Sequence, residues 1–322
     1  MSGAVDVHAH YVTPAYRSAL IAAGHSHPDG MPSIPDWSAE QALRFMDANG
    51  TRTALLSVSS PGVSLGDAAA NRDLARTANE EGAALVRARP DRFGLLASVP
   101  LPDVDAAVAE AVFALDRLGA DGIALETHYR GTYLGDPAFE PLMAELHRRR
   151  AVVHLHPTSP VCWQDTALGH PRPMLEFLFD STRAVTQLVL GGVLTRHPGI
   201  RFIVPHCGAT LPVVADRIAA FALASGGPPV DVLGALRRLH YDTAGFALPR
   251  ALPALLDLVS PDRLLYGSDH PFTNAAVATA QTKALAATPL LGAADKRALF
   301  SGTAHRLFPR LRERAGRTGG RS

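Results

Sequence analysis

Short apolar segments alternate with longer amphipathic segments along the whole chain. Eight segments have the apolar, β-branched character of buried strands, and they are residues 4–10, 53–60, 92–100, 122–128, 151–157, 201–208, 239–245 and 264–271. The stretches between them include helical patterns such as AEQALRFMDANG and DAAVAEAVFALDRLG. Strands that alternate with helices in this way predict repeated βα units and a parallel sheet.

The number of βα units favours a closed (β/α)8 barrel, the TIM barrel, because the chain has no Gly-rich phosphate-binding motif of an open doubly wound sheet. Two long connections, residues 11–37 and 158–175, follow the first and fifth predicted strands. Loops in these positions build the active site at the C-terminal face of such barrels. We therefore expect one barrel domain over residues 1–310 and a flexible, basic, Gly-rich tail over residues 311–322.

Composition narrows the class of protein. The 322 residues are 47% hydrophobic and 19% charged, with a net charge of +1, which predicts a globular domain with a large core and no nucleic-acid partner. The chain starts without a cationic, apolar leader and lacks a run of about 18 apolar residues, so we expect neither secretion nor membrane insertion. The only two cysteines, Cys162 and Cys207, have no C-x-x-C spacing. These features predict a cytoplasmic protein that acts on a small molecule.

Histidine and acidic residues gather where the predicted strands end. In the first strand, His8 and His10 are two positions apart, so both side chains project to the same face. The other strand ends carry Glu126 with His128, His154 with His156, His206, Asp242, and Asp269 followed by His270. Because the C-terminal ends of barrel strands meet at one rim, we expect these side chains to lie close together.

A rim of imidazoles and carboxylates inside an apolar barrel needs a partner. An unpaired buried polar group costs about 1–3 kcal/mol, and a divalent metal ion would satisfy several such groups at once. Nitrogen and oxygen ligands suit zinc, iron, manganese or cobalt. The pattern does not decide whether His154 is a core residue or lies behind the metal ligands. Histidines away from the strand ends are expected to be structural, and they are His147, His197, His240 and His305.

Five motifs, VDVHAH, HLHP, VPHCGAT, YDTAG and YGSDHPF, together resemble the amidohydrolase superfamily, from residue 5 to about residue 305. The resemblance is to its amidohydrolase-related branch, which includes aminocarboxymuconate-semialdehyde, γ-resorcylate and 6-methylsalicylate decarboxylases. It implies a barrel in which the metal ligands are His8, His10, His156 and Asp269. It also implies that His206 is either a catalytic acid/base or a ligand of a second metal ion, and that the chain forms a homodimer.

The chain departs from the pattern of this superfamily at strand four. Members with two metal ions commonly bridge them with a carboxylated lysine there, but the only lysines are Lys283 and Lys296, after strand eight. Some two-metal members use a glutamate instead, and this chain has Glu126, where the decarboxylases mostly have a neutral residue. Glu126 could therefore bridge two ions, or it could form a pocket salt bridge with Arg130 or another arginine. The sequence alone is therefore compatible with either one or two metal ions.

Two reactions fit this ligand set. On the basis of Glu126 we expect a hydrolase, in which a metal-activated hydroxide attacks an ester, thioester, lactone or amide of a small carboxylic acid and Asp269 transfers the proton. The alternative is a one-metal decarboxylase or hydratase acting on a hydroxybenzoate-like acid, in which His206 or Asp269 protonates the ring carbon. The arginines that could bind the substrate's carboxylate are Arg44, Arg130, Arg172 and Arg217. A non-catalytic barrel is disfavoured, because no ligand is missing.

Further residues are expected at the edge of the site. Trp163, in the second long connection, is expected to pack on the substrate. Arg217, on the helix after strand six, is expected to hold a carboxylate behind the metal ligands. His128 and Arg130 follow strand four closely enough to reach the same pocket.

Overall fold

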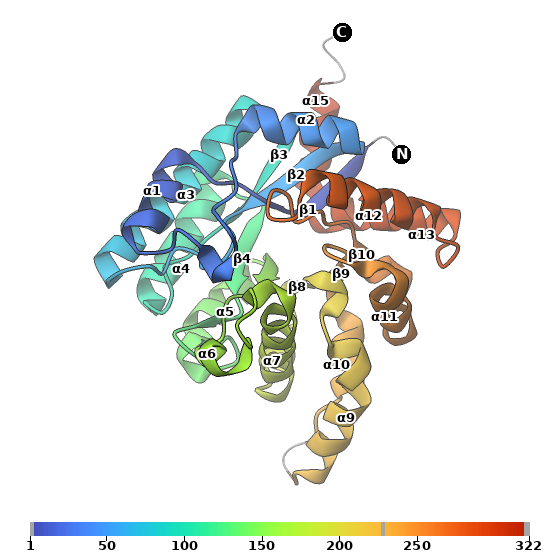
Figure 1. Ribbon diagram of the computed structural model, residues 1–322. Helices are drawn as coiled ribbons and strands as arrows, with labels where there is room; N and C mark the ends of the chain where they lie inside the picture. Colours follow the sequence, from blue (N-terminus) through green and yellow to red (C-terminus); the bar gives the residue numbers. More distant parts are fainter. Residues whose placement is uncertain (1–2, 227–228, 319–322) are drawn as a thin grey trace.

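The computed structural model describes residues 3–226 and 229–318, and in it helices surround a central ring of strands (Figure 1). All eight predicted strands are present. They are β1 (Ala4–His10), β2 (Thr51–Ser57), β3 (Phe93–Ala97), β4 (Gly122–Glu126), β7 (Val152–His156), β8 (Arg201–Val204), β9 (His240–Asp242) and β10 (Leu264–Leu265). A short hairpin of β5 (His128–Tyr129) and β6 (Thr132–Tyr133) follows β4.

The strands form one parallel sheet in the order β1-β2-β3-β4-β7-β8-β9-β10. The segment after β10 returns to β1 and closes the ring. The Val7 amide donates to the Tyr266 carbonyl at 2.9 Å, and the Asp269 amide donates to the His8 carbonyl at 2.7 Å. The predicted (β/α)8 barrel is therefore confirmed, although the last strand is shorter than expected because residues 266–271 bend across β1 after only two ladder positions.

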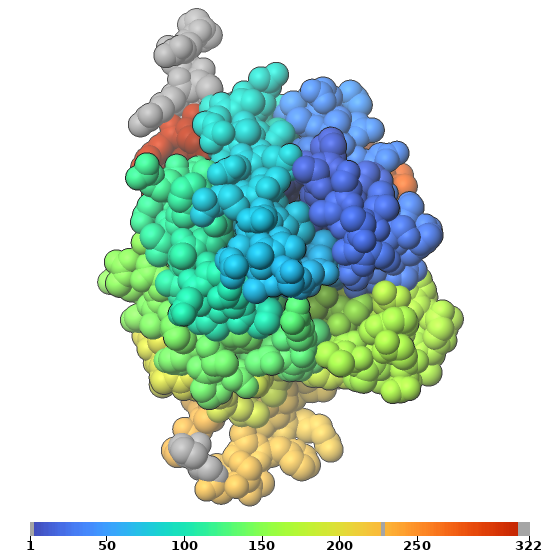
Figure 2. All heavy atoms as spheres, turned by 90° about the vertical axis from the view of Figure 1, so that its left-hand side faces the viewer, coloured from blue at the N-terminus to red at the C-terminus, as the bar shows by residue number. Residues whose placement is uncertain are grey.

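The helices fill the connections between the strands. They are α1 (Pro14–Ala22), α2 (Ala39–Asn49), α3 (Ala68–Ala88), α4 (Val104–Phe113), α5 (Glu140–Arg148), α6 (Trp163–Thr166), α7 (Glu176–Leu190), α8 (Val193–Arg196), α9 (Leu211–Ala224), α10 (Val232–Arg238), α11 (Leu252–Leu258), α12 (Ala275–Ala287), α13 (Ala293–Arg297), α14 (Thr303–Leu307) and α15 (Pro309–Thr318). Side-chain caps start several of them: Asp103 accepts from the Ala106 amide at the start of α4. Helix α9 projects from the body in both views (Figures 1 and 2). None of the described helices is long and apolar enough to cross a membrane.

A β-bulge in β1 aims the histidines. Val5 and Val7 belong to the apolar cluster inside the barrel, so simple alternation would turn His8 outward. Asp6 pairs with Ala54 of β2 and Ala9 pairs with Leu56. Between these two pairs β1 advances by three residues and β2 by only two. The extra residue reverses the alternation, so that His8 joins His10 inside the barrel.

The C-terminal helices close the opposite, N-terminal end of the barrel. Leu307, Phe308 and Leu311 are buried in the same apolar cluster as Val5 and Leu265. The predicted flexible tail of residues 311–322 therefore begins inside a helix, because an apolar side chain on α15 packs against the barrel. Residues 319–322 of that tail lie outside the described residues.

Candidate metal centre

Four side chains from three parts of the chain meet at the C-terminal end of the barrel. His8, His10, His156 and Asp269 each bring one ligand atom within 4.8 Å of the others. Oδ1 of Asp269 lies 3.2 Å from Nε2 of His10 and 3.6 Å from Nε2 of His8. Asp269 takes a left-handed backbone conformation, with φ of 57°, which turns its carboxylate towards the histidines. The structure thus brings together the four residues that the family resemblance implied.

Hydrogen bonds fix the tautomers of the two β1 histidines. Nδ1 of His8 lies 2.9 Å from the carboxylate of Asp242, and Nδ1 of His10 lies 3.3 Å from the carbonyl of Ser57. The carboxylate and the carbonyl only accept, and the Ser57 hydroxyl, 3.1 Å from Nδ1 of His10, donates its proton to the Ala9 carbonyl. Each Nδ1 therefore carries the proton and each Nε2 presents a lone pair. Both Nε2 atoms are buried and have no hydrogen-bond partner among the described residues. Two orphaned lone pairs beside a carboxylate suit a divalent metal ion.

The charge states also suit a metal. Burial lowers the pKa of His8 to about 4 and that of His156 well below its usual value, so both rings are neutral at pH 7. Burial alone would raise the pKa of Asp269, but the close contact with His10 and the other nearby imidazoles lower it to about 2. The group therefore offers the neutral imidazoles of His8 and His156 and an ionised carboxylate, as metal ligands require.

Asp242, at the end of β9, organises the ligands from behind. Its Oδ2 accepts from His8 and from Nε2 of His154, both at 2.9 Å, and its Oδ1 accepts from the amides of His206 and Ala244. Burial alone would raise the pKa of Asp242, but the two imidazoles hold it well below its usual range. Sequence reasoning placed Asp242 at the rim without a role. His154 is now assigned as its partner and lies behind the ligands.

His206 stands beside the four ligands without joining them. Its ring centre lies 5.1 Å from that of His8, and its backbone has a φ of 56° that begins a tight turn after β8. The amide of His206 is anchored on Asp242 at 3.1 Å, which fixes the position of the ring. Nδ1 is buried without a hydrogen-bond partner among the described residues, and the ring lines the cavity over the ligands.

Glu126 has carboxylate neighbours rather than a cation. Its Oε2 lies 3.6 Å from Nδ1 of His156, but it belongs to neither of the two groups of potential ligands found among the described residues. Arg130, its expected partner, donates instead to the carbonyl of Gly66 at 2.9 Å. Burial raises the pKa of Glu126 well above its usual value, and Asp29 and Asp180 raise it further.

The other expected site residues lie away from the ligands. His128 ties two loops together, since Nε2 lies 3.0 Å from the Ser159 carbonyl and Nδ1 accepts from the Gly131 amide. Trp163 stacks under the guanidinium of Arg172, 4.2 Å from the ring centre, and does not line the cavity over the ligands. Arg217 is exposed on α9 and covers its neighbour Phe221. We expected Trp163 and Arg217 to contact the site. Instead, Trp163 is held by a contact within its loop and Arg217 by a contact within its helix.

A cavity of about 540 Å³ opens directly over the ligands and is lined by His156, His206 and Asp269. Much of its wall is apolar, with side chains that include Met31, Met174, Phe177, Leu178, Phe272 and Val277. Both long connections contribute to this wall, as predicted. No lysine or arginine is among the described residues that line it.

Asp29 adds a carboxylate to the wall of this cavity, and sequence reasoning missed it. It sits in a turn after α1 with φ of 53°, and its Oδ1 accepts from Oγ of Ser159 at 2.5 Å. Nε of Arg172 donates to the same Ser159 oxygen at 3.0 Å. The two long connections are thus held together by this Asp29–Ser159–Arg172 chain. The one available signal was the PDG turn sequence.

Comparison with known proteins agrees with this geometry. A family model described as amidohydrolase matches residues 5–310. The chain belongs to this amidohydrolase family. A relative from Penicillium expansum, a 6-methylsalicylic acid decarboxylase, is 37% identical over 316 residues, covering 96% of this chain and 97% of the relative.

Solved structures of two decarboxylases show the same fold. A 2,6-dihydroxybenzoate decarboxylase complexed with 2,6-dihydroxybenzoate has a TM-score of 0.83 and 27% identity, covering 96% of this chain and all of the other. A dihydroxybenzoic acid decarboxylase from Polaromonas, with bound manganese and the inhibitor 2-nitroresorcinol, also has a TM-score of 0.83, at 22% identity and 96% and 97% coverage. The comparisons therefore favour the decarboxylase alternative over the hydrolase that Glu126 suggested.

Proposed function

We propose that this protein is a non-oxidative decarboxylase of a hydroxybenzoate-type acid and that it uses a single divalent metal ion. The observation that carries the proposal is the group of four ligands around one point, open to a largely apolar cavity of about 540 Å³. A second ion would need Glu126 as a bridge, and Glu126 belongs to neither group of potential ligands among the described residues.

His8, His10, His156 and Asp269 would hold the ion. When bound, it supplies a Lewis acid for the substrate's carboxylate and the adjacent hydroxyl oxygen. Manganese is the first metal to test, since a solved relative contains it, and the nitrogen and oxygen ligands also admit zinc and iron. Asp242 keeps His8 in the tautomer that presents Nε2.

The cavity wall selects the substrate. Aromatic and aliphatic side chains such as Phe177, Phe272 and Val277 offer packing for an aromatic ring. No lining cation among the described residues offers a second carboxylate a partner, and Asp29 would repel one. The carboxylate of Asp29 would instead accept a hydrogen bond from a hydroxyl group of the substrate. These features favour a monocarboxylic aromatic acid that carries hydroxyl groups.

The reaction replaces the carboxylate with a proton. The bond between the ring carbon and the carboxylate carbon breaks, its electron pair stays on the ring carbon, and carbon dioxide leaves. Asp269 is ionised at neutral pH, so it delivers a proton only after taking one from the substrate's hydroxyl group. His206, which lines the same cavity, is the other side chain placed to deliver the proton.

The test is product formation by the manganese-loaded protein with 2,6-dihydroxybenzoate and 6-methylsalicylate, followed by carbon dioxide release and chromatography of the phenol. We expect the His206→Asn variant to keep its metal and lose most activity, and the Asp269→Asn variant to lose both. Arg217→Gln, on the exposed face of α9, is the matched control and stays active. Hydrolysis of esters or thioesters without release of carbon dioxide from any hydroxybenzoate would overturn the proposal.

A further inference from the structure

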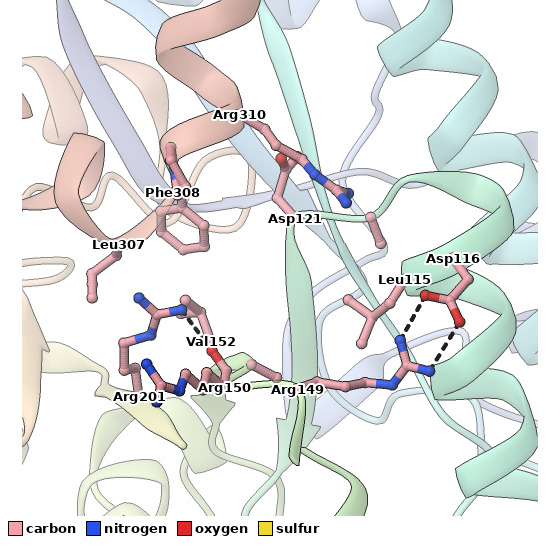
Figure 3. Close-up of a pocket in the computed structure, with 13 residues that line it drawn as sticks. Leu115, Asp116, Asp121, Arg149, Arg150, Val152, Arg201, Leu307, Phe308 and Arg310 are labelled. Carbon is pink, nitrogen blue, oxygen red and sulfur yellow. Dashed lines mark hydrogen bonds and ion pairs between the residues drawn. The ribbon is translucent and has the colours of Figure 1, made fainter. Parts of the chain in front are cut away.

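A second cavity, of about 250 Å³, lies at the N-terminal end of the barrel, away from the metal ligands (Figure 3). Its walls come from the turn before β4, the end of α5, the starts of β7 and β8, and the junction of α14 and α15. The side chains that matter for its charge are Asp116, Asp121, Arg149, Arg150, Arg201 and Arg310.

Both acidic side chains of this cavity are already paired. Arg149 holds Asp116 through two hydrogen bonds, of 2.6 and 2.9 Å, which Figure 3 shows at one side of the cavity. Asp121 pairs with Arg314 from α15. Each of these acids is neutralised by its own arginine, so neither compensates the remaining three.

Arg150, Arg201 and Arg310 form the unpaired cationic part of the cavity. No carboxylate of the described residues lies within ion-pair distance of any of the three guanidinium groups. Nη2 of Arg201 donates to the backbone carbonyl of Arg150 at 2.6 Å, so the two residues lie side by side (Figure 3). Nε of Arg201 is buried and has no hydrogen-bond partner in the described part of the chain.

The surroundings of Arg201 disfavour its positive charge. Burial and the neighbouring charge of Arg150 lower the pKa of Arg201, which means that its environment opposes the positive charge. Arg150 itself adopts a left-handed backbone, with φ of 51°, at the turn into β7. A buried donor without an acceptor and a like charge beside it would both be compensated by one oxyanion.

We infer that this cavity is a binding site for a small oxyanion of the phosphate class, held by Arg150, Arg201 and Arg310. The planar guanidinium fork matches the oxygens of a phosphate, and the volume exceeds that of several water molecules, at about 30 Å³ each. Free phosphate and the phosphate group of a small monoester share this chemistry. The site is independent of the proposed decarboxylation.

The test is calorimetric titration of the metal-loaded protein with inorganic phosphate and, separately, with glycerol 3-phosphate, at constant ionic strength. We expect the Kd to rise at least tenfold in Arg150→Gln and in Arg201→Gln. The matched control is Arg263→Gln. Like Arg201, Arg263 donates to a backbone carbonyl, that of Arg238 at 3.3 Å, but it lies outside this cavity. Tighter binding of the monoester than of phosphate would identify an organic phosphate as the ligand, and the reverse would identify free phosphate.

Two results would overturn the inference. One is no binding of either anion by the unchanged protein. The other is binding that persists in Arg150→Gln, which would place the anion elsewhere, including at the metal. Arg150 is exposed, so this variant is expected to fold and carries the test even if Arg201→Gln does not fold.

Discussion

The two ends of the barrel hold opposite chemistry. At the C-terminal end, imidazoles alternate with the carboxylates of Asp242 and Asp269, and the hydrogen bonds leave lone pairs aimed at one point. At the N-terminal end, Arg150, Arg201 and Arg310 line one cavity without an ion-pair partner among the described residues, and the charge of Arg201 also acts on His240 at the start of β9. The chain's net charge of +1 conceals this separation. The position of the charges decides what each end can bind. The lone pairs at the C-terminal end suit a cation, and the unpaired arginines at the N-terminal end suit an anion.

The largest effect is expected at the C-terminal end. Replacing His8 or His10 by Ala removes one of the four candidate ligands, next to the carboxylate of Asp269. We expect metal content to fall to near zero and decarboxylation to fall to the background rate, while circular dichroism still reports a folded barrel. The measurement is metal per chain by mass spectrometry. A metal-replete, active His8→Ala/His10→Ala double variant would contradict the assigned centre.

His240 sharpens the comparison through pH. Burial and the charges of nearby arginines lower its pKa from 6.5 to about 4, and the charged groups that influence it are Arg263, Asp262, Arg201 and Arg306. Between these values the unfolded chain binds the proton and the folded one does not. The stability that neutral His240 allows is therefore complete above pH 6.5 and is lost as the pH falls to about 4, by up to about 3 kcal/mol.

The matched measurement is the free energy of urea unfolding of wild type and His240→Gln at several pH values. The variant lacks this titration, so its stability relative to wild type should increase as the pH falls from 7 to 4. Acid effects of the metal ligands occur in both proteins and cancel in the difference. A difference that does not change with pH would show that His240 is not held neutral by its surroundings.

Asp242 tests whether the C-terminal end depends on groups behind the ligands. Asp242→Asn removes the charge that orients His8 and His154 while keeping the shape of the side chain. We expect metal affinity to weaken by about 10–100-fold, as is typical when the partner of a metal-binding histidine is changed. Titration with manganese measures this change, and activity should return at high metal concentration. Unchanged affinity would mean that packing alone orients His8.

Strand periodicity and strand-end position are local properties, so the sequence pattern predicted the barrel and a rim of histidines and carboxylates, and the family resemblance implied which four of them bind the metal. The β1 bulge that turns His8 inward and the backbone turn at Asp269 depend on pairing with β2 and on closure of the ring. The role of Glu126 was also out of reach. Its charge depends on Asp29, from the first long connection, and Asp180, from α7, neither of which is near it in sequence.

The smallest effect is expected at Glu126, and it bears most directly on the number of metal ions. If Glu126 is a neutral acid beside His156, Glu126→Gln preserves its size and hydrogen-bonding capacity. We therefore expect one ion per chain in both wild type and variant, with decarboxylation retained. The control is Glu126→Ala, which leaves a cavity and lowers stability without changing the count of ions. Two ions in wild type that fall to one in Glu126→Gln would make Glu126 a charged bridge and would restore hydrolysis as the better interpretation of the C-terminal end.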